Sequence, residues 1–324
     1  MSLRSARRQA MAAAALLCGV TLQPSWAVMA GAAPDSPAAR VDANAATSLW
    51  RGVVSVQTPA GVFSGVAVGR RHVLTAAHVL DTLPAPADVV VFFNASPVAV
   101  AVGAARYTRH PAYVGFGVPT LANDLALIEL VADRPSASTS YAIATLPPIA
   151  GTTVTVVGYG ASGHGDIGVS VARSTSVKRI GANALDVLAA DAEGVIRLFQ
   201  WDFDGPTAAT NFRGGPTLGN GVETTLAAGD SGAGVFQIVS GVPVLAGLAS
   251  FSGAFAGGPS GQGVFGTAGG GQVLAGYATW IRDVIAASGH ADPVEDVPLP
   301  GWAVLALAVA MAGRLTWRRR VASG

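Results

Sequence analysis

Residues 228–234 read Ala-Gly-Asp-Ser-Gly-Ala-Gly, and the fold is decided by this stretch together with two segments upstream of it. Glycines on both sides of a serine allow tight turns of the backbone and let a carbonyl group approach main-chain N–H groups. Taken alone, Gly-Asp-Ser-Gly is equally well explained as an ordinary loop. Its interpretation therefore depends on what precedes it in the chain.

The first upstream segment, residues 73–78, reads Val-Leu-Thr-Ala-Ala-His, and the second, residues 123–130, reads Asn-Asp-Leu-Ala-Leu-Ile-Glu-Leu. A strand that ends in small residues can present His78 at its rim, although a lone histidine in such a turn is more often structural. Asp124 heads an apolar strand, where a carboxylate is expensive to bury unless it is paired. A histidine Nδ1–H would satisfy it; a turn cap is the alternative explanation.

The conjunction of the three segments is specific. His78, Asp124 and Ser231 follow one another in the order His, Asp, Ser. Leu-Thr-Ala-Ala-His, Asn-Asp-x-Ala-Leu and Gly-Asp-Ser-Gly resemble the three signatures of trypsin- and chymotrypsin-like serine proteases. The resemblance extends over residues 49–289 and includes Tyr277-x-x-Trp280-Ile281 in a closing helix. It implies two six-stranded antiparallel β-barrels with the three residues in the cleft between them.

The resemblance also implies roles for these residues. Ser231 would be the nucleophile, His78 the general base and then acid, and Asp124 the group that orients the imidazole. The N–H groups of Gly229 and Ser231 would form an oxyanion hole. The expected function is that of a secreted endopeptidase, which hydrolyses peptide bonds of protein or peptide substrates through an acyl-enzyme and needs no cofactor or metal.

Substrate specificity is expected from five further positions. By the same resemblance, Thr225 would lie at the base of the specificity pocket, and Gly263 would line the opposite pocket wall. The strand Ser250, Phe251 and Ser252 would bind the substrate backbone. Since position 225 carries no acid, we expect a preference for an uncharged residue of small or moderate size at the cleavage site.

Asp230 resembles the family residue that pairs with a newly freed N-terminus when the enzyme matures. The basic residue upstream of the domain is Arg40, followed by Val41. Cleavage between them is one hypothesis for the source of that N-terminus. The sequence departs from the family in having Val79 where a cysteine usually follows the histidine, and Ala233-Gly234 where Gly-Pro usually follows the Gly-Asp-Ser-Gly motif. Neither change deletes a catalytic group.

The pattern between the motifs is typical of an all-β protein. Segments rich in β-branched residues recur at short intervals and are separated by Gly and Pro clusters. The expected strands cover residues 53–56, 62–68, 89–93, 98–102, 152–157, 169–177, 196–199, 234–239 and 244–248. The expected helix, residues 277–287, carries its apolar residues at helical spacing. We see no alternation of strands with long helices, which argues against an α/β hydrolase.

Composition narrows the function further. The 324 residues include 41 glycines, and the net charge is +1 with no basic stripe, so nucleic-acid binding has little support. The single cysteine, Cys18, falls in a predicted leader, which leaves no disulfide, thiolate metal site or cysteine nucleophile in the mature chain. Asp202 and Asp204, which begin a Gly- and Asn-rich loop, are either part of a calcium site or, more simply, a solvated turn.

The N-terminal residues 1–30 are typical of a secretory signal peptide, with Arg4, Arg7 and Arg8 before an apolar run. The sequence allows cleavage after Ala27, Ala30 or Ala32 and does not choose among them. Residues 31–46 are expected to form an exposed linker or a short propeptide, and residues 47–290 the protease domain.

The C-terminal end has a spacer (residues 291–297) followed by residues 298–324. Val297-Pro298-Leu299-Pro300, a short apolar run and an arginine cluster resemble the PEP-CTERM sorting signal of Gram-negative bacteria, in which an exosortase processes the tail. A plain membrane anchor is the alternative. Either way, we expect an exported protein of the cell envelope or extracellular matrix, held transiently at the inner membrane.

Three other functions are compatible with parts of the sequence. A binding module on a protease fold would need no active triad, and a structural envelope protein would need only the tail. An α/β-hydrolase esterase is disfavoured, because its serine precedes its histidine and because a Gly-x-Ser-x-Gly elbow is missing here.

Overall fold

The computed structural model describes residues 20–24, 28–96, 98–117 and 121–290. The predicted spacer and sorting signal, residues 291–324, lie outside this range, as does most of the predicted signal peptide. Within the part of the chain that is described, no helix has the length and apolar character needed to cross a membrane.

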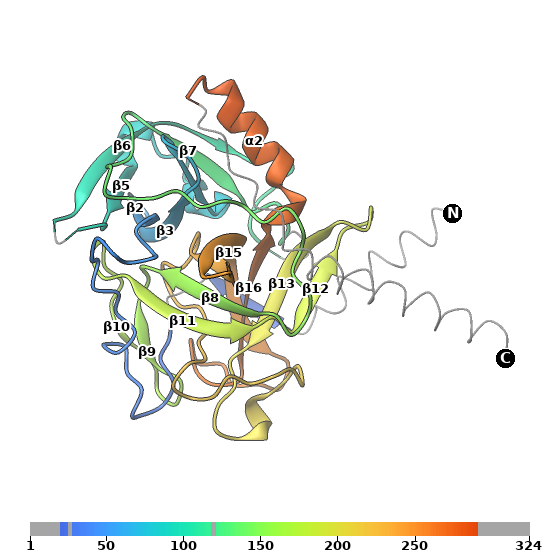
Figure 1. Cartoon of the computed structure of the whole chain (residues 1–324). Helices are drawn as coiled ribbons and strands as arrows, with labels where there is room; N and C mark the ends of the chain where they lie inside the picture. The colour runs from blue at the N-terminus through green and yellow to red at the C-terminus, as the bar shows by residue number, and fades with distance from the viewer. Residues whose placement is uncertain (1–19, 25–27, 97, 118–120, 291–324) are drawn as a thin grey trace.

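The first half of the chain forms a closed barrel in which six strands follow the order β2-β3-β4-β7-β6-β5 (Figure 1). Its strands are β2 (Val53–Thr58), β3 (Gly61–Ala67), β4 (His72–Thr75), β5 (Val90–Phe93), β6 (Val100–Arg109) and β7 (Ala126–Leu130). Two short 3₁₀ helices, η1 (Ala77–Leu80) and η2 (Pro86–Asp88), connect β4 to β5. β-Branched side chains such as Val56, Val73 and Ile128 fill the interior, as expected for residues that suit a pleated surface.

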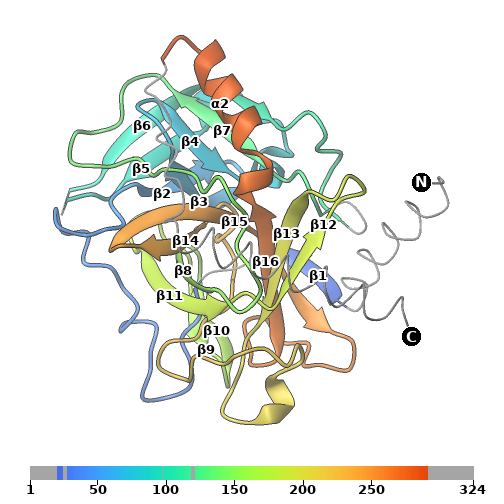
Figure 2. The same ribbon diagram turned by 45° about the vertical axis from the view of Figure 1, so that its right-hand side comes forward.

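The second half is an antiparallel sheet of eight strands in the order β11-β8-β14-β15-β16-β13-β12, with β1 paired to β15 beside this path. Its strands are β1 (Val20–Pro24), β8 (Thr153–Gly158), β11 (Arg179–Ala184), β12 (Val187–Ala190), β13 (Ile196–Asp202), β14 (Gly234–Val239), β15 (Val242–Phe255) and β16 (Thr267–Val273). A hairpin of β9 (Ser162–His164) and β10 (Gly168–Val171) lies beside the sheet (Figure 2). Loop residues include two further 3₁₀ turns, η3 (Ala208–Thr210) and η4 (Leu274–Gly276).

The two halves share one apolar core. Phe236 of β14 contacts the rings of Trp50 and Tyr141, with centroids 5.1 and 4.7 Å apart. The helix α2 (Ala278–Ala287) follows the last strand of the second half but returns to cover the first half (Figures 1 and 2). Ile281 and Ile285 of this helix are buried in the same core. The helix therefore fastens the two halves together.

The predicted fold class is confirmed: an all-β chain in two sheet-built halves with a C-terminal helix. The first half has the six strands expected, whereas the second half gains strands at its edges and its sheet has eight. One expectation was wrong. Residues 31–46 do not form an exposed linker, because Asp35, Arg40 and Asp42 are buried, with Arg40 paired to Asp35 and Asp42 paired to Lys178.

Candidate active site

His78, Asp124 and Ser231 lie in one hydrogen-bonded row. The Nε2 atom of His78 is 2.7 Å from the Ser231 hydroxyl oxygen, and its Nδ1 atom is 2.7 Å from Oδ2 of Asp124. The second oxygen of Asp124 accepts the main-chain N–H of His78 at 2.9 Å. These contacts fix both the position and the plane of the imidazole ring.

Strand pairing brings the histidine and the aspartate together. β4 pairs with β7 so that Thr75 lies opposite Ala126. His78 follows β4 by a few residues, and Asp124 precedes β7 by two, so both reach the same rim of the first barrel. The sequence motifs at residues 73–78 and 123–130 are therefore neighbours in space because of the register of one strand pair.

Ser231 comes from the second half of the molecule, and Ser64 of β3 couples it to the first. The Ser64 N–H donates to the Ser231 carbonyl at 3.0 Å, and the Ser64 hydroxyl donates to the Gly229 carbonyl at 2.7 Å. The Tyr159 N–H in turn donates to the Ser64 hydroxyl at 2.9 Å. The loop that carries Ser231 is thus tied to the barrel that carries His78.

The two glycines of the Gly-Asp-Ser-Gly loop are required by its backbone. Gly229 and Gly232 have φ values of 98° and 86°, a region that residues with a side chain rarely adopt. A Cβ atom on Gly232 would lie 2.1 Å from the Ser64 carbonyl oxygen. No hydrogen bond within the described residues occupies the N–H of Gly229 or of Ser231, so both groups are available as hydrogen-bond donors.

Asp124 is fully buried and keeps its charge through its partners. Besides the two contacts from His78, its Oδ2 atom accepts the Ser250 hydroxyl at 2.5 Å. Burial favours the neutral acid, but the charge and hydrogen bonds of His78 and the bond from Ser250 outweigh it and lower the pKa of Asp124. Asp124 is therefore an anion that accepts hydrogen bonds from His78 and Ser250.

The pairing of His78 with Asp124 raises the pKa of His78, whereas it lowers that of Asp124. Burial disfavours the imidazolium, but the Asp124 carboxylate and its hydrogen bond outweigh this and raise the pKa of His78 above 6.5. Phe116 packs against the ring, with centroids 4.7 Å apart. This contact shields a ring that is already nearly buried and holds it toward Ser231.

A second layer of polar side chains supports Asp124, and the sequence did not indicate it. The Gln272 amide group donates to the Leu121 carbonyl at 2.8 Å and lies 3.3 Å from the Ser250 hydroxyl. The Tyr277 hydroxyl donates to the Gln272 carbonyl oxygen at 3.2 Å and accepts the Asn123 N–H at 3.0 Å. The sequence places Tyr277 on an apolar helix face, which gives no signal for this use of its hydroxyl group.

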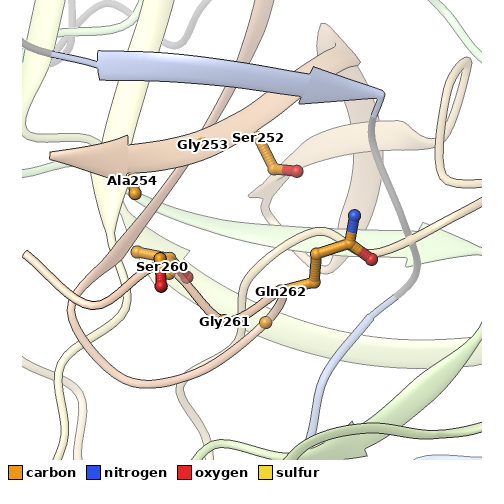
Figure 3. Close-up of a pocket in the computed structure, with 8 residues that line it drawn as sticks. Ser252, Gly253, Ala254, Ser260, Gly261 and Gln262 are labelled. Atoms are coloured by element: carbon orange, nitrogen blue, oxygen red, sulfur yellow. The ribbon is translucent and has the colours of Figure 1, made fainter.

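The predicted substrate-binding residues fall into three places. Ser250, Phe251 and Ser252 are consecutive on β15, although the Ser250 hydroxyl serves Asp124. Ser252 and Gly263 line one small pocket (Figure 3). Thr225 is fully buried, and its hydroxyl group has no hydrogen-bond partner among the described residues.

Trp201 and Gly269 lie beside Thr225, and neither was expected there. A Cβ atom on Gly269 would lie 2.5 Å from Trp201 Nε1 and 3.1 Å from Thr225 Oγ1. The Trp201 Nε1–H also lacks a partner in the described part of the chain. Two buried polar groups, both neutral, therefore meet at this glycine of β16.

Asp230 is also fully buried, and the structure leaves one of its oxygens, Oδ1, without a partner among the described residues. Burial raises the pKa of Asp230, although the Gly160 N–H and the Arg179 charge act against it.

Arg40 is buried against Asp35 rather than presented for cleavage, while Val41 is partly exposed and its N–H bonds to the Ala38 carbonyl. No contact between Val41 and Asp230 is found in the described chain.

Asp202 and Asp204 belong to an acidic group with Asp186 and Glu223. Their oxygens accept several main-chain N–H groups, for example Arg213 N–H to Asp202 and Asp204 N–H to Glu223, each at 2.7 Å. Within the described residues, no three side chains of the metal-ligating types are grouped so as to hold an ion. Asp202 and Asp204 are both buried, so the expectation of a solvated turn was wrong, and the calcium alternative gains no support from this arrangement.

Comparison with known proteins identifies a family for most of the chain. The family model described as Trypsin matches residues 40–267. This stretch contains all three residues of the hydrogen-bonded row. No curated protein matches the chain.

Proposed function

Since the chain belongs to the trypsin family and is therefore a serine-type peptidase, we propose that it is an exported endopeptidase that uses Ser231, His78 and Asp124 as its triad. The observation that carries this proposal is the position of His78. Its two ring nitrogens lie 2.7 Å from the Ser231 hydroxyl and 2.7 Å from the Asp124 carboxylate. Such a row combines a nucleophile, a base and a group that orients the base.

In the proposed mechanism, the Ser231 oxygen attacks the carbonyl carbon of the scissile bond while His78 Nε2 takes the hydroxyl proton. The Asp124 anion stabilises the imidazolium that forms. The N–H groups of Gly229 and Ser231 bind the oxyanion, an interaction worth about 3 kcal/mol per donor. His78 then protonates the leaving amine and, with water in place of the amine, directs hydrolysis of the acyl-enzyme.

The proposed preference is for an uncharged side chain at the cleavage site. Thr225, Trp201 and Gly269 carry no charge, and the two polar groups among them are buried. A Lys or Arg side chain would have to leave water without a carboxylate at position 225 to receive it, which is strongly unfavourable. A small or medium neutral side chain meets no such cost.

A mixed peptide library tests activity and preference together. The purified, leader-processed chain is incubated with the library beside a Ser231→Ala variant, and the products are sequenced by mass spectrometry. We expect cleavages that vanish in the variant and follow neutral residues. Cleavage after Lys or Arg would refute the specificity. A folded chain that neither cleaves peptides nor reacts with a serine-directed phosphonate would favour a binding module instead.

The localisation proposal rests on the two ends of the sequence. We propose export to the cell envelope, with residues 298–324 holding the chain at the inner membrane until an exosortase-type enzyme processes it. Fractionation of cells that express the whole chain, beside a variant lacking residues 298–324, tests this. Equal distribution of both forms between membrane and soluble fractions would refute it.

A further inference from the structure

The chain from residue 28 to residue 42 is built into the second half of the molecule. Val28, Met29 and Ala30 are fully buried, although the sequence allows them to belong to a removable leader. The Met29 N–H donates to the Thr225 carbonyl at 3.1 Å, and the Ala30 N–H donates to the Gly163 carbonyl at 3.0 Å. Because the protein has a single cysteine, no internal disulfide fastens this segment. Non-covalent contacts must hold it in place.

Further on, the same segment lies along the free edge of β11, the strand at one end of the eight-stranded sheet. The Ile180 N–H donates to the Arg40 carbonyl at 2.8 Å, and the Ala182 N–H donates to the Val222 carbonyl at 3.1 Å. Alternate residues of a strand direct their N–H groups to the same edge. Residues 40 and 222 are therefore neighbours along this edge of β11, although they are far apart in the sequence (Figure 1).

The Arg40 side chain connects the two segments. Its Nη1 atom donates to the Val222 carbonyl at 2.7 Å, and its Nη2 atom donates to the Glu223 carbonyl at 3.1 Å. Asp35 fixes the guanidinium, because its carboxylate accepts Nε at 3.0 and 3.1 Å and Nη2 at 2.5 Å. Every nitrogen of the guanidinium group thus has an acceptor.

The pair of Asp35 and Arg40 is buried and charged. Only 9% of Asp35 and 8% of Arg40 are exposed. Burial raises the pKa of Asp35, but the Arg40 bonds and charge and the N–H groups of Gly31 and Ser36 outweigh burial and lower it. A buried ion pair adds little net stability compared with apolar residues of the same size. What the guanidinium adds is a rigid, planar set of donors, which neither an apolar residue nor a lysine offers to two carbonyls.

The two carbonyls belong to the stretch that leads to Thr225, the residue proposed at the base of the specificity pocket. Glu223 is held at both of its ends. Arg40 binds its carbonyl, and its carboxylate accepts the N–H groups of Asp204 and Leu218, each at 2.7 Å. Thr225 follows two residues later, so its position depends on these contacts.

The proposed catalytic row is fastened by a different residue. Ser64 of the first barrel holds the Gly229 carbonyl at 2.7 Å and the Ser231 carbonyl at 3.0 Å. Arg40 makes no hydrogen bond to either residue in the described chain. The contacts that fix residues 222 and 223 are therefore separate from those that fix the nucleophile.

We propose that Arg40, oriented by Asp35, is a positioning residue for the specificity pocket: it holds residues 222 and 223 at the edge of β11 and so determines where Thr225 lies. Its effect on substrate binding rests on the proposed function. Its effect on the order of residues 218–226 does not, because that effect follows from the hydrogen bonds alone.

The first test is amide hydrogen exchange of the full chain, read by mass spectrometry on a peptide that covers residues 218–226. Arg40→Lys keeps a cation beside Asp35 but loses the planar set of donors. Losing one bond between a charged donor and a carbonyl should speed exchange in this peptide about tenfold. Exchange at the wild-type rate would overturn the proposal, and this readout needs no catalytic activity.

Asp42→Asn is the matched control. Asp42 lies two residues after Arg40 and also forms a buried ion pair, with Lys178 at 2.9 Å. Lys178 donates to the Trp50 carbonyl of the first half at 2.9 Å, not to residues 222–225. Asp42→Asn should lower the free energy of unfolding and leave exchange in residues 218–226 at the wild-type rate. If it speeds this exchange as much as Arg40→Lys does, the effect is a general loosening of the segment and the proposal fails.

The second test separates KM from kcat. Because Ser64 holds the nucleophile independently, Arg40→Lys should raise KM for a neutral peptide about tenfold and leave kcat within about twofold of the wild-type value. Asp42→Asn should change neither constant by more than about twofold. An unchanged KM in Arg40→Lys, or equal losses of kcat in both variants, would overturn the positioning role.

The two tests together distinguish this inference from the proposed function. If no form cleaves peptides but Arg40→Lys alone speeds exchange in residues 218–226, the proposed function fails and the positioning role of Arg40 stands. If all forms cleave peptides with the same KM and exchange equally, the inference fails and the protease function stands.

Discussion

The Ser250 hydroxyl and the His78 imidazole share one oxygen atom of Asp124: Oδ2 lies 2.5 Å from Ser250 Oγ and 2.7 Å from His78 Nδ1. In the proposed mechanism, Ser250 thus acts on His78 through the Asp124 carboxylate. It is a positioning residue for the triad in addition to its place on the strand proposed to bind substrate.

Replacing Ser250 by alanine removes a hydrogen-bond donor from Asp124, which stays charged through its bonds from His78, so the carboxylate then interacts more strongly with the imidazolium of His78. The pKa of His78 is raised by Asp124, and the base works only when neutral, so activity falls as pH drops through that value. In Ser250→Ala we expect this acid limb to move to higher pH and, because Asp124 loses a bond that holds it in position, kcat to fall about tenfold. The pH profile of kcat/KM measures both.

The matched control is Ser55→Ala. Ser55 is also a buried serine, and its hydroxyl donates to the Thr175 carbonyl at 2.8 Å, away from the triad. The Ser55→Ala variant should be less stable to unfolding than the wild-type chain, and the acid limb of its kcat/KM profile should stay at the wild-type pH. An unchanged profile in Ser250→Ala would refute the positioning role.

Gln272→Leu should disconnect the second layer from Asp124. Gln272 joins Tyr277 to Ser250 and to the Leu121 carbonyl, and all of its contacts are buried. Losing them leaves unsatisfied groups, so we expect about 2 kcal/mol less free energy of unfolding and a lower kcat. Urea denaturation and steady-state kinetics check this. Tyr277→Phe removes only the hydrogen bonds at the far end of this row and should lower the free energy of unfolding and kcat by less than Gln272→Leu does. A larger effect of Tyr277→Phe would contradict the account.

The acidic group beside the long loop predicts that stability falls as pH rises. Burial and the neighbouring Asp202 charge raise the pKa of Asp204 to about 7, from 3.8. A group that holds its proton more tightly when folded stabilises the fold below its unfolded pKa, and this contribution is lost as pH rises through the folded value. Asp204→Asn should therefore gain up to about 4 kcal/mol over the wild-type chain at pH 8 and less than about 1 kcal/mol at pH 4. Thermal unfolding at both pH values measures it, with the exposed Asp166→Asn as the unaffected control.

Thr225→Asp should change the cleavage preference to Lys and Arg. The substitution introduces a buried carboxylate that only a cationic side chain can neutralise. We expect the ratio of kcat/KM for a Lys peptide over its neutral counterpart to rise at least about a hundredfold, as read from paired peptides. Thr225→Val, which has the same shape and no charge, should keep the neutral preference. If the preference of Thr225→Val also changes to Lys and Arg, the charge at position 225 does not set the specificity.

The sequence was sufficient to predict that His78, Asp124 and Ser231 come together, because each of them stands in a short motif next to a strand. It was also sufficient for strands with β-branched residues, such as β2 and β14. It was not sufficient for β16, which reads Thr-Ala-Gly-Gly-Gly-Gln-Val and looks like a loop. The glycines of β16 are there because large neighbours crowd the strand: a Cβ on Gly270 would lie 2.3 Å from the Phe251 ring.

The supporting layer and the buried N-terminal segment were missed for a different reason. Gln272 and Tyr277 act through hydrogen bonds that depend on tertiary packing, and no local pattern encodes them. Val28 to Ala30 are small or apolar residues that suit a leader as well as a core. Only their burial and their bonds to Thr225 and Gly163 distinguish the two.

The most direct measurement is the site of reaction with a peptidyl phosphonate, mapped by mass spectrometry on the exported, leader-processed chain, with His78→Ala as the control. The account predicts one adduct, on Ser231, that forms at least about a thousandfold more slowly in His78→Ala because the hydroxyl then has no base. An adduct on another residue, or equal rates in both forms, would contradict the assignment of Ser231 and His78 as nucleophile and base.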